Sequence, residues 1–360
     1  MSKRVVLVLG SSTGGIGQHV ASLARGLAGR GFTVTVVGPA ATAERFDFTG
    51  AAYHVVPIPT GPRAVPALSR ALADLRPDVI HAHGLRAGLV AGMARPAGVP
   101  FVVTWHNAVL AKGLRGAVHR LLERRVARLA DVTLGASADL VARATAVGGR
   151  DVRLCPVAAP DLREPARPPE DVREELGVSP GQPLLLSVGR LHPQKGYDVL
   201  IAAAARWGLR KPPPVVAVAG TGPAYLRLAA LASQSRAPVV LLGHRDDVAD
   251  LLAAADLAVV TSRWEARQLF AQEALRAGVP LVATSVGGLP ELVGDAAVLV
   301  PPGDPDAVDA AVADLLDHPE RRAALAARGR EKAATWPTEE QTVDRVQTLY
   351  AELTGLPAER

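Results

Sequence analysis

Two glutamates close together in the chain carry the clearest chemistry in the sequence. Glu265 and Glu273 are separated by seven residues, between two apolar runs. The run at residues 257–260 is typical of a buried parallel strand, and residues 269–277 are typical of a helix. We therefore expect Glu265 in a loop at the carboxyl end of a strand, which is the edge of an open α/β sheet that binds ligands. The alternative is that both are solvated surface acids.

A second loop of the same kind holds two basic residues. Residues 189–196 (GRLHPQKG) follow the apolar run 184–188 and contain Arg190 and Lys195. Only five of the 40 basic residues are lysines, so a lysine beside a glycine in a loop is unusual for this chain. An arginine grips a phosphate with two N–H groups, and a lysine adds a compact point charge. The loop therefore predicts a phosphate site.

A glycine-rich loop near the start of the chain favours an anion as well. Residues 10–17 (GSSTGGIG) lie between an expected strand at 4–9 and a helix that runs to about residue 30. Such a loop lets backbone amides approach an anion at a helix N-terminus. The next expected strand ends in Gly38 and Pro39, without the acid that dinucleotide binding needs. A nicotinamide enzyme is therefore disfavoured.

Three histidines follow expected strands in the first half of the chain. His81 and His83 lie at the end of the strand at 79–82, and His106 follows the strand at 101–104. The carboxyl ends of parallel strands form the ligand edge of the sheet. His106 is the better candidate for a functional role, whereas His81 and His83 are expected to be packed or hydrogen-bonded.

The most basic helix is expected at residues 112–129. Arg120, Arg124 and Arg128 form one stripe of it, and apolar residues cluster on another face: Leu114, Val118, Leu121, Leu122 and Leu129. The ordinary interpretation is an amphipathic domain helix with a solvated arginine face. The alternative is a patch for anionic lipid head groups.

Composition limits the class of protein. The 360 residues are 49% hydrophobic and 4% aromatic, which indicates two domains with aliphatic cores. A single cysteine, Cys155, favours a reducing compartment. No signal peptide or membrane span is recognised, so we expect a cytoplasmic protein with at most peripheral contact at the inner face of the membrane. The net charge of +5 allows attraction to phosphates, but no nucleic-acid partner is expected.

Alternating strands and helices predict two α/β domains with parallel sheets. A proline-rich stretch without periodicity, residues 158–169, separates them. The expected domains are residues 1–162 and 170–335, with a last helix at about 338–360 that crosses back to the first domain. Asp304-Pro-Asp306 reads as a helix N-cap with proline at the first helical position, not as a metal site.

Several short segments of the chain are each a weak signal of a protein family, but their occurrence together in this order is specific. On these segments the chain resembles the large retaining glycosyltransferase family 4, of the GT-B fold: two Rossmann-like, doubly wound parallel-sheet domains that face each other across a cleft. The resemblance runs nearly end to end and rests on Gly14-Gly15-Ile16 with His19-Val20, residues 78–83, Thr104-x-His106, residues 189–196, Gly220-x-Gly222-Pro223, Gly243-His244, the Glu265 and Glu273 pair, and Gly287-Gly288-x-Pro290-Glu291.

The resemblance implies a nucleotide-diphosphate-sugar donor and a role for each matching residue. Arg190 and Lys195 would neutralise the diphosphate, Glu273 would accept from ribose hydroxyls, and Glu265 and His106 would contact the sugar. The remaining expected donor-binding residues are Gly14, Gly15, Gly222, His244 and Leu269. Cations at the leaving diphosphate stabilise the charge that develops there, so neither a metal nor a cofactor is expected. The acceptor is not indicated.

Two departures from the family pattern bear on these expectations. Residues 266–268 read Ala-Arg-Gln where the family usually has Gly-Phe-Gly or similar, and Ala158-Ala159 stands where an Asn-Gly pair is usual. The first departure leaves the donor sugar open. The competing interpretations are a nucleotide-sugar 2-epimerase of the same fold and a catalytically silent nucleotide-sugar-binding protein.

Overall fold

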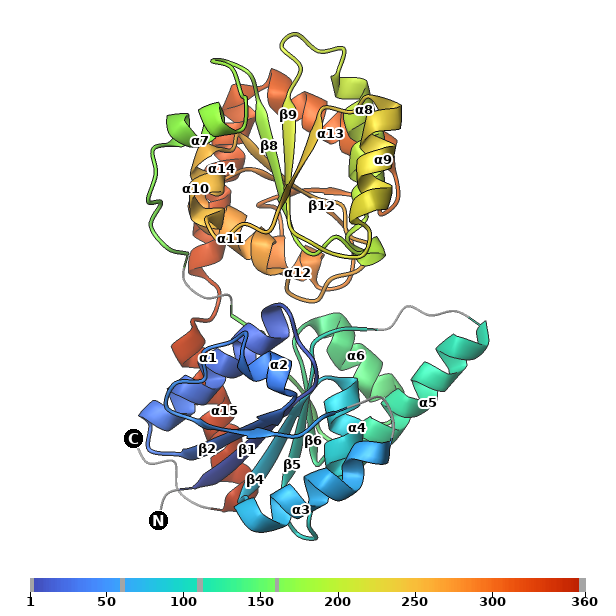
Figure 1. Ribbon diagram of the computed structural model, residues 1–360, viewed down its shortest axis with the longest axis vertical. Helices are drawn as coiled ribbons and strands as arrows, with labels where there is room; N and C mark the ends of the chain where they lie inside the picture. The colour runs from blue at the N-terminus through green and yellow to red at the C-terminus, as the bar shows by residue number, and fades with distance from the viewer. Residues whose placement is uncertain (1–2, 59–61, 109–112, 159–161, 356–360) are drawn as a thin grey trace. The chain divides into compact units, whose positions relative to one another are not determined.

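The computed structural model describes residues 3–58, 62–108, 113–158 and 162–355. Lys112, Ala159 and the end of the last expected helix beyond residue 355 lie outside the described residues. The chain divides into two compact units (Figure 1). Unit 1 comprises Met1–Pro160 with Pro337–Arg360, and unit 2 comprises Asp161–Trp336.

Unit 1 is built on a parallel sheet. Its described residues form seven strands in the order β3-β2-β1-β4-β5-β6-β7, and every neighbouring pair is parallel. The strands are β1 (Arg4–Leu9), β2 (Thr33–Gly38), β3 (Ala52–Val55), β4 (Val79–His83), β5 (Phe101–Trp105), β6 (Val132–Gly135) and β7 (Val152–Leu154). The helices of unit 1 are α1 (Gly15–Gly29), α2 (Ala40–Ala43), α3 (Val65–Leu75), α4 (Leu85–Ala94), α5 (Gly113–Leu129), α6 (Ala138–Ala146) and α15 (Glu339–Thr354), with a 3₁₀ turn at Pro62–Ala64.

The last helix belongs to the first unit. Thr338 opens α15 with a capping box, in which its hydroxyl accepts from the Gln341 amide while the Gln341 side chain accepts from the Thr338 amide. The helix packs against α1, where the side chain of Val343 fills the space in which Gly26 lacks a side chain. Tyr350 is fully buried in the core of unit 1.

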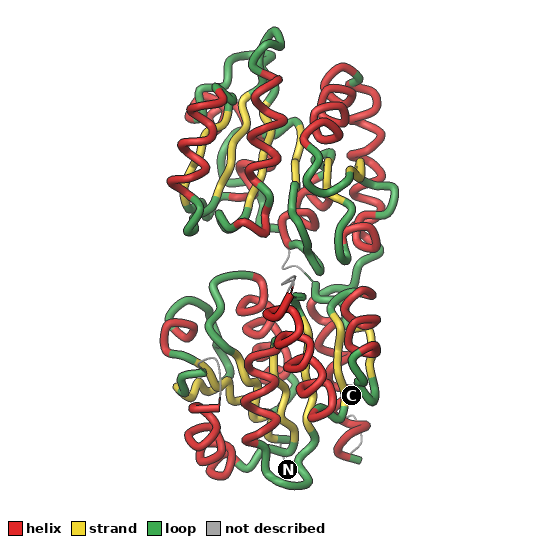
Figure 2. The backbone as a smooth tube through the Cα atoms, turned by 90° about the vertical axis from the view of Figure 1, so that its right-hand side faces the viewer, coloured by secondary structure: helices red, strands yellow, loops and turns green. Residues whose placement is uncertain are grey.

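Unit 2 repeats the architecture. Its described strands lie in the order β10-β9-β8-β11-β12-β13, all parallel: β8 (Leu184–Val188), β9 (Val215–Ala219), β10 (Val239–Gly243), β11 (Leu257–Val260), β12 (Leu281–Thr284) and β13 (Val298–Val300). The helices are α7 (Pro169–Glu175), α8 (Tyr197–Trp207), α9 (Tyr225–Ser235), α10 (Val248–Ala254), α11 (Leu269–Ala277), α12 (Leu289–Val293), α13 (Pro305–Asp317) and α14 (Pro319–Ala334), with a 3₁₀ turn at Pro193–Lys195. In each unit, helices flank the strands on both faces (Figure 2).

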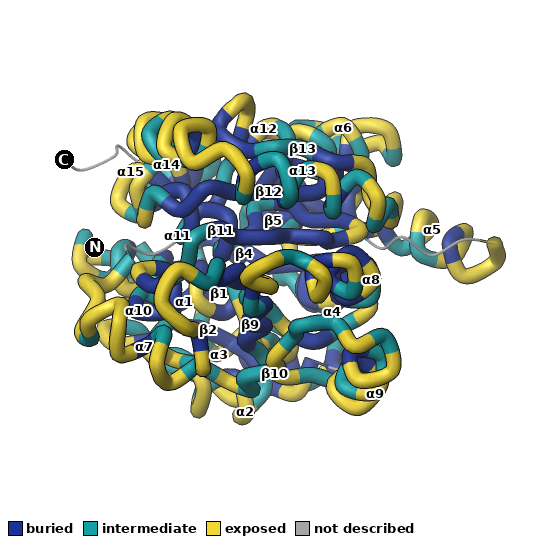
Figure 3. The backbone as a smooth tube through the Cα atoms, turned by 90° about the horizontal axis from the view of Figure 1, so that it is seen from above, coloured by how far each residue is buried: buried dark blue, intermediate teal, exposed yellow. Residues whose placement is uncertain are grey.

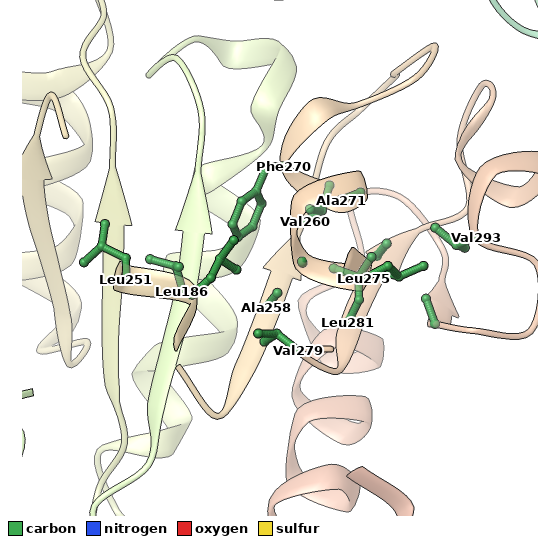
Figure 4. Packing of buried hydrophobic residues seen from close by; sticks show 14 of the residues in the cluster. Leu186, Leu251, Ala258, Val260, Phe270, Ala271, Leu275, Val279, Leu281 and Val293 are labelled. Carbon is green, nitrogen blue, oxygen red and sulfur yellow. The ribbon is translucent and has the colours of Figure 1, made fainter. Parts of the chain in front are cut away.

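The apolar runs form strands because both faces of each sheet are covered. Leu186, Ala258 and Leu281 come from three neighbouring strands and pack with Phe270 and Leu275 of α11 (Figure 4). The alternate strand residues point to the other face, where Leu185 and Leu257 pack against helices α8 and α13. A strand buried on both faces reads as a continuous apolar segment, which is how these strands were predicted. Figure 3 shows the same burial for β4 and β5 of unit 1.

Two expectations about particular segments can be compared directly with the structure. Asp304 caps α13, and its carboxylate accepts from the amides of Asp306 and Ala307 at 3.0 Å each, which confirms the predicted N-cap. Among the described residues, no helix is long and apolar enough to cross a membrane.

Candidate functional site

The sheet of unit 2 changes direction between two neighbouring strands. The chain passes from β8 outward to β9 and β10, then returns to β11 on the other side of β8. The loops that follow β8 and β11 therefore leave the carboxyl edge of the sheet side by side. This is the topological switch point, where open α/β sheets bind ligands.

The structure brings Lys195 and Glu265 together at this point. The Nζ atom of Lys195 lies 2.6 Å from Oε1 of Glu265, and the Ser262 hydroxyl donates to the same carboxylate oxygen at 2.7 Å. The two charged side chains are only 18% and 10% exposed. Ser262 was not predicted as a site residue, although it lies three positions before Glu265 directly after a strand. The result is a partly buried ion pair in which the ammonium is slightly more exposed than the carboxylate.

Backbone contacts hold the two loops against each other. The Gln194 side chain donates to the Trp264 carbonyl at 2.9 Å, and the Arg263 amide donates to the Gln194 carbonyl at 2.7 Å. Gly196 has φ +64, and a side chain there would meet the carbonyl of Thr261. Only glycine permits this approach, so Lys195 is carried on a loop that is fixed before any ligand binds.

The other predicted basic and glycine residues lie around this pair. Arg190 is exposed in the loop after β8. Gly222 packs against the backbone of Leu191, and no side chain would fit there. His244 follows β10 and is exposed, with its Nε2 atom 3.0 Å from Oδ1 of Asp246. Donor contacts by these three residues stay predictions.

Glu273 lies in the second turn of α11 and is half-buried. Burial raises the pKa of its carboxyl group, and the charge of Arg276 opposes the shift. Leu269 is the first residue of the same helix, whose N-cap is Gln268: its side chain accepts from the Ala271 amide at 3.1 Å. The Gln268 cap is a second feature that the sequence did not reveal, because glutamine is uncommon in that role. It occupies one of the helix amides that a ligand would otherwise reach.

Unit 1 has its own switch point, between β1 and β4. The loop after β1 ends at Gly14, which is the N-cap of α1 and has no side-chain cap. The Gly17 amide donates to the Ser12 hydroxyl at 2.9 Å and to the Gly14 carbonyl at 3.0 Å. No heavy atom would lie within 4 Å of a side-chain carbon at Gly14. Ser12 therefore already occupies the Gly17 amide of the first turn of α1, which leaves the amides of Gly15 and Ile16 for an anion.

Histidines fill the carboxyl edge beside this loop. His81 is buried between the Tyr350 hydroxyl and the Thr104 hydroxyl, at 2.7 Å from each, which confirms the expected hydrogen bonding. His83 Nδ1 lies 3.1 Å from Nε2 of His106. The ring of His19, for which the residues alone predicted no chemistry, packs edge-on against both, at centroid distances of 5.6 and 5.3 Å.

The four imidazoles are neutral at neutral pH. Burial lowers the pKa of His19 to about 4. Burial, together with the nearby His19, lowers the pKa of His81 to about 3. Burial is also the main reason why the pKa values of His83 and His106 lie well below the usual value for histidine.

Helix α5 differs from an ordinary domain helix. Leu114, Val118 and Leu121 are 83%, 50% and 66% exposed, so the predicted apolar face does not enter the core at these positions. The buried side instead contains Glu123, whose carboxylate accepts from Arg143 at 3.0 Å. The amino-terminal part of α5 projects away from the rest of unit 1 (Figure 3). The interpretation as an amphipathic domain helix is therefore wrong for this part.

Comparison with known proteins identifies the family. Residues 14–160 match the family described as glycosyl transferase 4-like domain, and residues 169–332 match glycosyl transferases group 1. The 2-deoxystreptamine N-acetyl-D-glucosaminyltransferase of Streptomyces fradiae is 32% identical over 86% of this chain and 84% of its own length. The D-inositol 3-phosphate glycosyltransferase of Thermobispora bispora is 35% identical over 77% of this chain and 71% of its own.

Solved structures share the fold along almost the whole chain. Sucrose-phosphate synthase from Thermosynechococcus elongatus superposes with a TM-score of 0.82, covering 98% of this chain and 99% of that one at 22% identity. The Anabaena protein HepE in complex with UDP gives 0.83, covering 97% and 100% at 21% identity. Sequence relatives and fold agree: the chain belongs to the glycosyl transferases group 1 and is a glycosyltransferase with the two parallel-sheet α/β domains of the GT-B fold.

Proposed function

We propose that the chain transfers a sugar from a nucleotide-diphosphate-sugar donor to an acceptor with retention of configuration, without a metal or other cofactor. The observation that carries the proposal is the Lys195–Glu265 pair at the switch point of unit 2, with Arg190 exposed beside it. The pair places a fixed cation and an acid on one rigid edge. The solved structures of HepE with UDP and with UDP-glucose support a donor of this class.

The charges on the residues fit the charges of the reaction. As the bond between the sugar C1 and the diphosphate oxygen breaks, the sugar gains positive character and the diphosphate gains a negative charge. Lys195 and Arg190 stabilise the leaving diphosphate, and Glu265 contacts the sugar. Glu273 accepts from the ribose hydroxyls. Because Glu265 is already bound by Lys195 and Ser262, we assign attack by the acceptor hydroxyl to the face from which the diphosphate leaves, with the hydroxyl proton passing to the leaving phosphate.

The unit 1 residues complete the donor site in this proposal. The amino-terminal end of α1 at Gly14 and Gly15 binds the diphosphate through backbone amides, since Gly14 has open space around it and no side chain caps the helix there. His106 is neutral and donates or accepts a hydrogen bond at a sugar hydroxyl.

A donor panel tests this function. The purified protein is incubated with UDP-, GDP- and ADP-sugars, with and without acceptors, and nucleotide diphosphate release is measured. The acceptors named for the relatives, 2-deoxystreptamine and D-inositol 3-phosphate, serve as first probes beside a cell extract. We expect release that depends on the acceptor and continues in EDTA. Loss of turnover in EDTA that magnesium or manganese restores would refute the metal-free mechanism.

The same panel separates the alternatives. A nucleotide-sugar 2-epimerase would release nucleotide without any acceptor, and a silent binding protein would release none. The relatives found are glycosyltransferases, so neither alternative is favoured. Acceptor-independent release at the full rate would replace the transferase proposal by the epimerase one.

We further propose that α5 binds the surface of an anionic membrane, so that the enzyme works peripherally at the cytoplasmic face. Leu114, Val118 and Leu121 are exposed on one side of the helix. On the helical wheel the stripe of Arg120, Arg124 and Arg128 lies next to them, and all three arginines are exposed. Apolar side chains for the acyl boundary with adjacent cations for the head groups are the composition of an interfacial helix.

Vesicle co-sedimentation tests the membrane contact. Three arginines contribute about 1 kcal/mol each near an anionic surface, so replacing Arg120, Arg124 and Arg128 by glutamine should abolish most binding to anionic vesicles. Neutral vesicles should bind little of either protein. The matched control replaces three exposed arginines of unit 2, namely Arg227, Arg328 and Arg330. Equal loss in the control, or no loss in the α5 variant, would exclude this helix as the membrane contact.

A further inference from the structure

Three histidines of unit 1 converge from separate elements. His19 lies in the second turn of α1, His83 is the last residue of β4, and His106 follows β5 directly. Each offers one ring nitrogen such that all three nitrogens lie within 4.8 Å of one another. No other group of this kind was found among the described residues. Three imidazoles at such distances form the ligand set of a transition-metal ion.

His83 faces the other two histidines through one ring nitrogen. His81, next to it, has a hydroxyl partner for each of its own ring nitrogens, so it does not join the cluster. His83 is only 3% exposed, and its Nδ1 atom faces Nε2 of His106 at 3.1 Å. An ion in the cluster therefore takes Nδ1 of His83, and the Nε2 atom of that ring is not one of its ligands.

We propose that His19, His83 and His106 bind one Zn²⁺ ion and leave its fourth position open. Nitrogens at the usual zinc distance are roughly 3.4 Å apart around a tetrahedral ion, so the 3.1 Å pair already has nearly the required spacing. The His83 ring is held by stacking on His81 at 4.3 Å between centroids. His106 is less buried and moves by a side-chain rotation. Three protein ligands with an open position distinguish this site from a closed structural zinc site.

The ion regulates the transferase and is not required by it. This step rests on the proposed function, in which His106 contacts the donor sugar. An ion bound to His106 takes the lone pair that the sugar hydroxyl would use and adds positive charge beside the developing positive charge of the sugar. Zinc is therefore expected to inhibit transfer, and a chelator is expected to restore the full rate.

Direct binding tests the site without any donor. Tag-free full-length protein is titrated with ZnCl₂ by calorimetry, and with CoCl₂, whose visible absorption reports low-coordinate nitrogen ligation. We expect one ion per chain and an affinity at least about tenfold weaker in His19→Asn and in His106→Gln. These replacements keep polar side chains of similar size at the two less buried positions, and circular dichroism verifies folding. The control variants are His244→Ala and His318→Ala, two exposed histidines of unit 2.

The outcomes separate this proposal from the proposed function. The site is refuted if the wild type takes up no zinc, or if the control variants lose as much affinity as the cluster variants. Neither result bears on sugar transfer, because no donor is present. In the second arm, zinc is added to the transferase assay and then removed with EDTA. Zinc bound at the cluster with an unchanged transfer rate would overturn the inhibitory role.

Discussion

The loops after the first strand of each unit have the same place in the fold and opposite surroundings. In unit 1, no atom lies within 4 Å of where a side chain would begin at Gly10 or Gly14. In unit 2, a side chain at Gly196 would meet Thr261, and Leu191 of the same loop packs against Gly222 of the loop after β9. Glycine therefore leaves room for a ligand in the first loop and lets the chain pack on itself in the second.

The two loops also differ in charge: the loop of unit 2 carries an ion pair, and the edge of unit 1 is uncharged. Unit 2 sets Lys195 against Glu265 in a partly buried ion pair that is formed without a ligand. Unit 1 presents helix amides and neutral histidines at the corresponding edge. The comparison teaches that one topology supports a pre-organised charged half-site and an open uncharged one.

The largest effect is expected from removing the unit 2 cation. Lys195→Ala should lower kcat by about 100- to 1,000-fold, because the developing charge on the diphosphate loses a positioned donor. Steady-state rates with the identified donor measure the effect. Thermal unfolding verifies that the variant stays folded although Glu265 has lost its ion-pair partner. Lys211→Ala, at an exposed position, is the control. A loss below about tenfold would mean that Lys195 only anchors the loop.

The two glutamates should separate binding from turnover. A charge-assisted hydrogen bond contributes roughly 1.5 to 3 kcal/mol, so Glu273→Ala should weaken nucleotide diphosphate binding by about 10- to 150-fold. Glu265→Gln should bind the nucleotide nearly as the wild type does while its turnover falls, because its partner is the sugar. Calorimetry with the nucleotide measures the binding of each variant, and steady-state rates measure its turnover. Wild-type binding and rate in two folded variants would make both glutamates surface acids.

A pair of glycine substitutions tests the contrast between the loops. Gly196→Ala forces a side chain into a left-handed position against a carbonyl and should reduce the free energy of unfolding by about 1 to 3 kcal/mol. Gly14→Ala has extended backbone and free space, so we expect a change near 0.5 kcal/mol. Thermal unfolding gives both values. Equal losses would show that the loop of unit 1 is packed as tightly as that of unit 2.

The smallest effect is a pH dependence of nucleotide binding. In the proposed donor site the ribose hydroxyls donate to the ionised form of Glu273, so nucleotide affinity should be present above the pKa of this group and be lost as pH falls through it. Because burial raises that pKa, the loss should begin at a higher pH than for an ordinary glutamate. Calorimetry at several pH values with Glu273→Gln as reference isolates this component from titration of the diphosphate. Identical pH profiles for the two proteins would contradict it.

Much of unit 2 could be predicted because apolar runs alternate with glycine and proline. Strand β11 and helix α11 have the predicted bounds. Helix α14 was not predicted. It is rich in charged residues and buries only Leu325 and Gly329, so its sequence shows little hydrophobic periodicity. Helix α6 was missed for a similar reason, with two buried residues, Leu140 and Ala144.

The site was predictable by residue type but not by contact. The sequence indicates that Lys195 and Glu265 lie at strand ends, but their ion pair depends on β8 and β11 being neighbours. His19 lies on a helix, and nothing local indicates that its ring meets two strand ends. For α5, the helical wheel shows an apolar side but not whether it faces the protein. In the structure, the side of α5 that faces the protein contains the buried Glu123, which accepts a hydrogen bond from Arg143.

The return of α15 to unit 1 has a consequence for biosynthesis. His81 and its partner Tyr350 are 269 residues apart in the chain. At ordinary elongation rates the ribosome needs about 15 to 50 s to cover that distance. During this interval the whole of unit 2 emerges while the face of α1 that receives Val343 stays uncovered. The synthesis of unit 1 begins before that of unit 2 and ends after it, so this face of α1 keeps its apolar surface exposed until α15 arrives.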